Sequence, residues 1–178
     1  MSSPALMAER RFWPLFWTQF SGAFNDNVFK NAVVILITYR SAGLFGLGTD
    51  QMVALCGGLF ILPFFLLSAF AGEIADKWPK NRIAYYTKVA EVFIMGLGVV
   101  GFLTDSLPTL IGALFLMGAQ STLFGPVKYS ILPELLHEDE LVKGNALVEM
   151  GTFLSILLGT LLGGVLVGLG DAGVKYVC

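Results

Sequence analysis

Charge is scarce in this chain of 178 residues. Asp, Glu, Lys and Arg together make up 13% of it, whereas a soluble domain usually carries about a quarter. Hydrophobic residues make up 56%, and the mean hydropathy is +0.76. These values exclude an ordinary soluble domain and predict an all-α integral membrane protein. The net charge of −2 and the isoelectric point of about 5.3 are not those of a nucleic-acid-binding protein, so nucleic acid is not expected as a partner.

Cysteine and histidine are rarer still. The two cysteines are Cys56, within an apolar run, and Cys178, at the last position, and they form neither a disulfide framework nor a metal-ligand spacing. The single histidine, His137, precedes three acidic residues, and we interpret this segment as a solvated loop. No metal, cofactor or catalytic residue is expected.

Long apolar runs are what the chain has instead. Five runs are near or above the ~20 residues that cross a bilayer as a helix, namely 12–39, 51–73, 83–103, 107–132 and 146–169. The first run is too long and too polar for a cleavable signal peptide. We therefore treat 1–178 as one transmembrane bundle. A sixth span starts at 174–178 and does not continue, so we expect either a fragment of a longer protein or a chain that assembles with another.

The positions of the basic residues predict the orientation. Those on one side of the predicted membrane are Arg10, Arg11, Lys77, Lys80, Arg82 and Lys143. The other side has Arg40 and Lys175. Because cytoplasmic loops carry an excess of basic residues, we expect the N-terminus in the cytoplasm.

Small residues recur every four positions in the fifth run. One series is Ser155, Gly159 and Gly163, and Gly164 and Gly168 repeat the interval. Small residues at this spacing let helix backbones approach closely in lipid. The pattern predicts helix packing and does not indicate a cargo.

Polar residues interrupt the first run. Gln19, Gly22, Asp26 and Lys30 follow steps of three, four and four, so they share one helical face. Asp26 lies roughly 20 Å from the start of the run. A carboxylate is costly in hydrocarbon, so this face should line a wet cavity or meet a partner. We predict a substrate-binding or coupling site from Asp26, Gln19, Asn27 and Lys30. An internal Asp26–Lys30 ion pair is the structural alternative.

Charges also occur in later runs. Lys128 follows Gly125-Pro126, which we expect to break the helix beside a cavity, although Lys128 would instead reach the headgroups if it snorkels. In the fifth run Glu149 lies between Asn145 and Thr152 on a polar stripe. In the third run Lys88 and Glu91 are three apart, a spacing that allows an ion pair.

The segment between the second and third runs, GEIADKWPKNR at 72–82, resembles the signature loop of the major facilitator superfamily. The matching residues are Gly72, Asp76, Lys77, Lys80 and Arg82. The resemblance implies that the glycine permits close helix contact and that the charged residues form a cytoplasmic gating latch between two halves of a transporter. Pro79 stands where the family usually has a second glycine.

Within that superfamily the chain resembles the lysophospholipid transporter family, including the transporter portion of transporter–acyltransferase fusions. The segments that carry this resemblance are QFSGAFNDN at 19–27, FGPVKYSILPELL at 124–136 and LVKGNALVEMGTFLSILLGTLLGGVL at 141–166. The resemblance implies the N-terminal six-helix half of a major facilitator fold, truncated in the sixth span. By the same resemblance, Asp26, Lys128 and Glu149 match charged positions of the family's cavity.

Such transporters flip lysophospholipids, such as lysophosphatidylethanolamine, to the inner leaflet of the bacterial inner membrane by alternating access. The implied partners are the lysophospholipid, membrane lipids, the missing C-terminal half and a lipid acyltransferase. Two alternatives stay open: a proton-coupled facilitator-type exporter of another solute, and a non-transporting membrane module attached to an acyltransferase. The chain itself is not expected to be an enzyme, because His137 lacks the aspartate five residues on that the acyltransferase motif requires.

Overall fold

The computed structural model describes residues 6–40, 46–170, 173 and 176–177. Five long helices dominate them: α1 (Trp13–Arg40), α2 (Thr49–Lys77), α3 (Lys80–Leu103), α4 (Leu107–Leu135) and α5 (Leu141–Gly168). Two short 3-10 turns, η1 (Leu6–Ala8) and η3 (Glu138–Glu140), precede α1 and α5. The described part contains no strand, which confirms the all-α prediction. The predicted start of a sixth span at 174–178 and the side chains of Arg40 and Lys175 lie largely outside the described residues.

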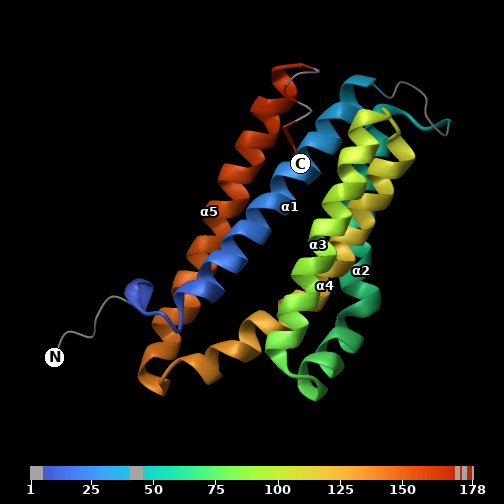
Figure 1. Cartoon of the computed structure of the whole chain (residues 1–178). Helices are drawn as coiled ribbons and strands as arrows, with labels where there is room; N and C mark the ends of the chain where they lie inside the picture. Colours follow the sequence, from blue (N-terminus) through green and yellow to red (C-terminus); the bar gives the residue numbers. More distant parts are fainter. Residues whose placement is uncertain (1–5, 41–45, 171–172, 174–175, 178) are drawn as a thin grey trace.

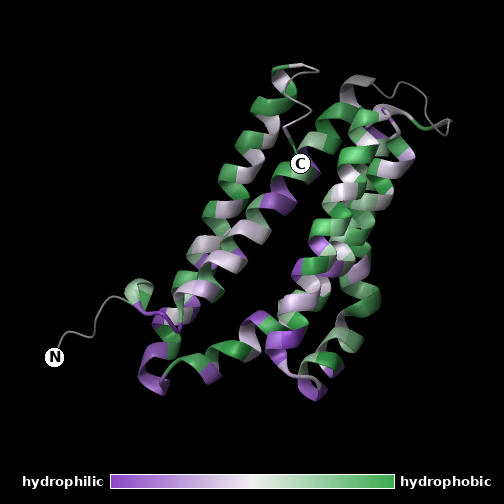
Figure 2. Ribbon diagram, viewed as in Figure 1, coloured by the Kyte–Doolittle hydropathy of each residue, from purple (hydrophilic) through white to green (hydrophobic). Residues whose placement is uncertain are grey.

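The helices run alternately up and down as two groups (Figure 1). In one group α1 packs along α5, and in the other α2 and α3 both pack against α4. The short connections place the start of α1, the α2–α3 link and the α4–α5 link at the same end. This is the end where the sequence places most of its basic residues, and Figure 2 shows it as hydrophilic.

Four helical segments are long and apolar enough to cross a membrane, namely Thr49–Lys77, Lys80–Leu103, Leu107–Leu135 and Glu138–Gly168. Large apolar side chains on them face outward, as with Phe65 at 80% exposure and Phe93 at 75%. An outer surface of this kind suits lipid and would be a liability in water. Helix α1 coincides with the predicted first span, but it is too polar to be counted among the helices that could cross a membrane by length and hydropathy. The count of five spans therefore stays a prediction.

Two sequence interpretations are wrong in detail. The segment 72–82 is not a loop, because α2 continues to Lys77 and α3 begins at Lys80. Only Trp78 and Pro79 separate them, and Trp78 is extended, as a residue before proline tends to be. Nor does Gly125-Pro126 break α4, which is one helix with Pro126 inside it. Proline in a helix interior bends it, and Figure 1 shows the last part of α4 turning toward α5.

Two of the three apolar clusters among the described residues pack on α1, at different heights in the bundle. The first joins α1, α2 and α4 through Phe29, Val33, Met52 and Leu114. The second, nearer the start of α1, joins α1, α4 and α5 through Phe12, Phe16, Leu132 and Val148. The stretch of α1 between the two clusters, from Gln19 to Asn27, carries the polar residues. The core therefore leaves a polar level in the middle of the bundle.

Arg11 ties the segment before α1 to the α4–α5 link. Its guanidinium donates to both carboxylate oxygens of Glu140 at 2.8 Å, to the carbonyl of Leu135 at 3.0 Å and to Glu9. The pKa of Arg11 lies above its ordinary value, chiefly because Glu9 accepts this hydrogen bond. The three nitrogens of the guanidinium thus bind three different residues, with Nη2 on Glu140, so Arg11 aligns the start of α1 with the start of α5.

Arg11→Ala is expected to lower the melting temperature of the detergent-solubilised protein, because it removes contacts to three partners at once. Arg10→Ala is the matched control, since Arg10 is the exposed neighbour with the same charge. Thermal unfolding followed by tryptophan fluorescence measures the difference between the two variants. Equal melting temperatures for both variants would contradict the assigned role. High salt should reduce the difference, because the pair is only partly shielded from water.

Candidate functional site

A cavity of about 260 Å³ lies at the polar level between the two groups of helices. Helix α1 contributes Gln19, Asp26 and Asn27 to its wall, and α4 contributes Ser121 and Lys128. Its apolar side is formed by Phe60 and Phe64 of α2 and Phe124 of α4, and α5 contributes Thr152. Three residues of the predicted polar face of α1, Gln19, Gly22 and Asp26, thus line this cavity, whereas the fourth, Lys30, is not part of its wall.

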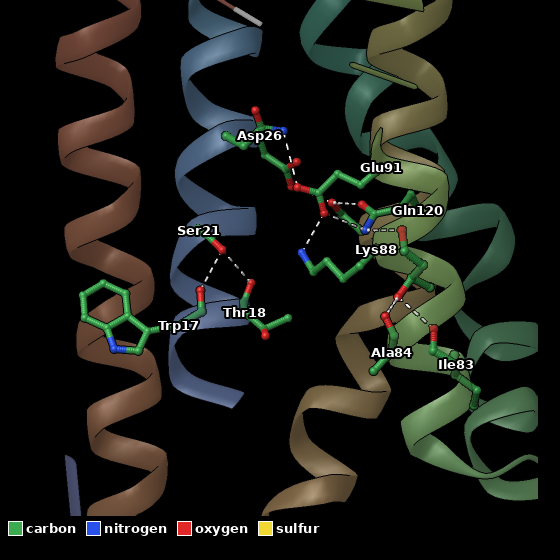
Figure 3. A network of polar contacts seen from close by, with 12 residues as sticks. Trp17, Thr18, Ser21, Asp26, Ile83, Ala84, Lys88, Glu91 and Gln120 are labelled. Carbon is green, nitrogen blue, oxygen red and sulfur yellow. Dashed lines mark hydrogen bonds and ion pairs between the residues drawn. The ribbon is translucent and has the colours of Figure 1, made fainter. Parts of the chain in front are cut away.

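Asp26 is the most unusual group of this cavity. Its Oδ2 accepts a hydrogen bond of 2.6 Å from Ser121 Oγ on α4. Its Oδ1 is buried and has no hydrogen-bond partner among the described residues. A buried carboxylate oxygen without a donor is costly, so this oxygen needs an explanation in the function of the site. Figure 3 shows Asp26 on α1 facing Glu91 and Gln120 of the neighbouring helices.

The alternative of an Asp26–Lys30 ion pair is not what the structure shows. The Lys30 ammonium donates to Asn27 Oδ1 at 2.9 Å and lies 5.2 Å from the centre of the Phe60 ring. Lys30 is therefore hydrogen-bonded to Asn27, one turn earlier on α1, and not to Asp26. The amide of Asn27 donates in turn to the carbonyl of Ala23 at 2.7 Å.

Lys128 is buried, with 7% of the residue exposed, so it does not snorkel. Its ammonium lies 3.2 Å from Glu149 Oε1 and 4.3 Å from the centre of the Tyr129 ring. Tyr129 donates to the same carboxylate oxygen at 2.7 Å. Glu149 is half-exposed and holds Lys128 from α5, while Lys128 itself lines the cavity. The structure thus brings these two predicted residues together through the bend in α4.

Gln19 links the two polar stripes that the sequence shows. Its Nε2 donates to Thr152 Oγ1 at 3.2 Å, across the contact between α1 and α5. Asn145, on the same stripe of α5 as Thr152, is exposed and donates to the carbonyl of Leu141 at 3.0 Å. Thr152 therefore belongs to the cavity, and Asn145 lies away from it.

The residues predicted to form a gate lie at the end of the bundle, away from the cavity. Lys77 forms an ion pair of 2.5 Å with Glu73, and Lys80 forms one with Glu134 at the end of α4. Asp76 and Arg82 are exposed. A side chain added at Gly72 would meet nothing within 4 Å, so the close helix contact implied by the resemblance is not formed among the described residues.

Sequence reasoning missed part of the cavity wall. Gln120 and Ser121 were not among the predicted residues, although Gln120-Ser121-Thr122 forms a polar trio inside an apolar run. The Lys88–Glu91 pair was expected and is confirmed at 2.6 Å, but its place beside the cavity was not. The spacing of residues within α3 contains no information on which side chain reaches α1.

Comparison with known proteins finds relatives among membrane proteins. The model of a major facilitator family described as transmembrane secretion effector matches residues 18–178. A lysophospholipid transporter LplT of Photorhabdus laumondii is 33% identical over 152 residues, which cover 84% of this chain and 34% of that relative. Lysophospholipid transporters LplT of Yersinia pestis and Yersinia pseudotuberculosis are 32% identical over 151 residues, or 83% of this chain and 34% of each relative. No solved structure matches the chain significantly.

These matches define the class as an integral membrane protein of the major facilitator superfamily. The chain belongs to this superfamily, and its predicted place in the lysophospholipid transporter family is confirmed. It spans about a third of the length of the curated relatives it matches. The relatives are named as transporters and not as enzymes.

Proposed function

We propose that this chain is the N-terminal half of a transporter that flips lysophospholipids, such as lysophosphatidylethanolamine, to the inner leaflet of the bacterial inner membrane. The observation that carries the proposal is the cavity in which the carboxylate of Asp26, with its unpartnered oxygen, faces the same space as the ammonium of Lys128. The names of the curated relatives support the class of cargo.

A zwitterionic headgroup complements this pair of charges. Its ammonium would donate to Asp26 Oδ1, and its phosphate would accept from Lys128, which Glu149 and Tyr129 hold in place. Hydrogen bonds between charged groups are roughly twice as strong as neutral ones, so they can replace the water that the headgroup loses on entry. A volume of about 260 Å³ suits a headgroup whose acyl chain stays outside, along the apolar wall of α2.

Alternating access requires a second half. In transporters of this architecture two bundles rock about a site near the middle of the membrane. The C-terminal half would close the cavity from the open side, and Gly72, Asp76, Lys77, Lys80 and Arg82 would meet it at the cytoplasmic end. The positions of these residues at the same end of the bundle as Arg10 and Arg11 support a cytoplasmic N-terminus. A lipid acyltransferase that consumes the product is the further proposed partner.

Flipping by the complete transporter in proteoliposomes tests the proposal. A fluorescent lysophosphatidylethanolamine in the outer leaflet should become protected from a membrane-impermeant quencher, and unlabelled lysophosphatidylethanolamine should compete. Monoacylglycerol should not compete, because it offers neither an ammonium to Asp26 nor a phosphate to Lys128. The present 178 residues alone should give no flipping, because the second half of the pathway is missing.

The same assay separates the alternatives. Transport of a different solute driven by a proton gradient, without competition by lysophospholipid, would favour the proton-coupled exporter. No flipping by the complete protein, despite correct folding, would favour the non-transporting module. Either result would overturn the proposed function.

A further inference from the structure

Lys88 belongs to α3, a helix that packs mainly on α4, yet its ammonium reaches the wall of the cavity beside α1. The approach depends on Gly22 of α1. A Cβ added at Gly22 would overlap the Lys88 Nζ atom, so the ammonium occupies space that only glycine leaves free. Figure 3 shows Lys88 extending from α3 toward α1. The absence of a side chain at Gly22 thus leaves room beside α1 for the Lys88 ammonium.

Glu91 and Phe124 hold this ammonium in place. Glu91 Oε2 accepts from Lys88 Nζ at 2.6 Å and from Gln120 Nε2 at 3.2 Å, and Glu91 Oε1 accepts from Asn25 Nδ2 at 3.4 Å. The ammonium also lies 4.9 Å from the centre of the Phe124 ring. One carboxylate on α3 is therefore hydrogen-bonded to α1, α3 and α4 together. This arrangement orders a side chain that would otherwise be flexible.

The ordered ammonium keeps hydrogen-bonding capacity for a ligand. A lysine ammonium has three donors, and its one hydrogen bond to a described residue goes to Glu91. The face of Phe124 attracts the cation without using a donor. Glu91 is not part of the cavity wall, whereas Lys88 is. Lys88 is therefore the member of the pair that a ligand in the cavity can contact.

We propose that Lys88 is a second phosphate-binding cation of the cavity, acting with Lys128, and that Gly22 is required because it admits Lys88. The inference rests on the proposed function, since it assigns a residue to the same lysophospholipid site. The two lysines come from different helices, α3 and α4, and a phosphate group has enough oxygens to accept from both. In this arrangement the two lysines bind the phosphate, and Asp26 binds the ammonium of the substrate.

Kinetics of lysophosphatidylethanolamine flipping by the complete transporter test this assignment. Lys88→Met should raise KM about tenfold with a smaller change in maximal rate, because a substrate contact is lost. Lys88→Arg, which keeps the charge, should recover at least part of that loss. Gly22→Ala should also raise KM, because the added methyl group overlaps only the flexible end of Lys88, with Glu91 Oε2 at an ordinary 3.6 Å, and pushes that end aside without disturbing a backbone. Gly96→Ala on α3 is the control, since a Cβ there meets nothing within 4 Å.

A double variant separates binding from structural charge balance. If Lys88 only neutralises Glu91, then Lys88→Met combined with Glu91→Gln should restore the wild-type KM, because no unpaired charge remains. If Lys88 binds phosphate, KM stays raised in the double variant. Restoration, or a Gly22→Ala protein that behaves like Gly96→Ala, overturns the inference while leaving the proposed function intact. A folded wild type that flips no lysophospholipid overturns both.

Discussion

Asp26→Asn is expected to reduce lysophospholipid flipping by about 10- to 150-fold while leaving the protein folded and inserted. Asparagine keeps the volume of the side chain and can still accept from Ser121, so the contact between α1 and α4 survives. What is lost is the charge that the buried Oδ1 offers to a substrate ammonium. Hydrogen bonds to charged groups contribute roughly 1.5–3 kcal/mol, which corresponds to that range of rates.

Initial flipping rates in proteoliposomes measure this effect, with size-exclusion profiles as the check on folding. Asp50→Asn is the matched control, because Asp50 is an exposed aspartate in the first turn of α2, outside the cavity. It should leave the rate unchanged. If Asp26→Asn flips lysophospholipid as fast as the Asp50→Asn protein, the carboxylate has no role in cargo binding and the proposed site is wrong.

Gly159→Ala and Gly163→Ala are each expected to destabilise the protein by about 1–3 kcal/mol, the usual cost of inserting atoms into a packed interface. A Cβ at Gly159 would lie 2.6 Å from the carbonyl oxygen of Phe24, and one at Gly163 would lie 2.6 Å from that of Val28. Both obstacles are backbone atoms of α1, which cannot turn away as a side chain does. Helix α1 would have to move off α5, and the polar face of the cavity would move with it.

The control lies on the same helix. Gly168 is exposed in α5, and an added Cβ there meets nothing within 4 Å. Alanine is ordinarily the better helix former by roughly 0.5–1 kcal/mol, so Gly168→Ala should be neutral or stabilising. Denaturation in detergent, followed by far-UV circular dichroism, measures the change in the free energy of unfolding of each variant, whether it is a loss or a gain. Destabilisation of equal size at all three positions would show that glycine matters to the helix itself and not to its contact with α1.

These glycines also show where sequence reasoning stops. The sequence contains two small-residue series in the fifth run, and spacing alone gives them equal weight. The structure assigns the close backbone contact to the first series, since Gly159 and Gly163 are buried against the backbone of α1. In the second series, Gly164 is half-buried beside the side chain of Ile35, and Gly168 is exposed. Which stripe packs depends on how α5 is rotated about its axis. That rotation is set by the packing of α5 against α1, so the sequence of the fifth run alone does not determine it.

The ends and bends of the helices were harder to predict than their existence. Apolar length placed all five helices, because a bilayer needs about 20 residues of helix to cross it. A helix does not have to end where the hydrocarbon of the bilayer ends, however. Helix α2 continues through the predicted loop to Lys77, and a Glu73–Lys77 ion pair lies along this last part. Pro126 bends α4 where a break was expected, and this bend lets Lys128 meet Glu149 of α5.

The sequence by itself determined that this is a helical membrane protein of the major facilitator superfamily, with Asp26 on a polar face that needed a partner. Composition, apolar length and local spacing are enough to predict the helices and the polar face, because each concerns one helix in its solvent, whereas the superfamily was indicated by the resemblance of the segment at 72–82. Only the tertiary structure decided that Ser121 binds Asp26, that Glu149 holds Lys128, and that Lys88 reaches α1 past Gly22. Those contacts join residues far apart in the chain, and they depend on how the helices rotate and bend against one another.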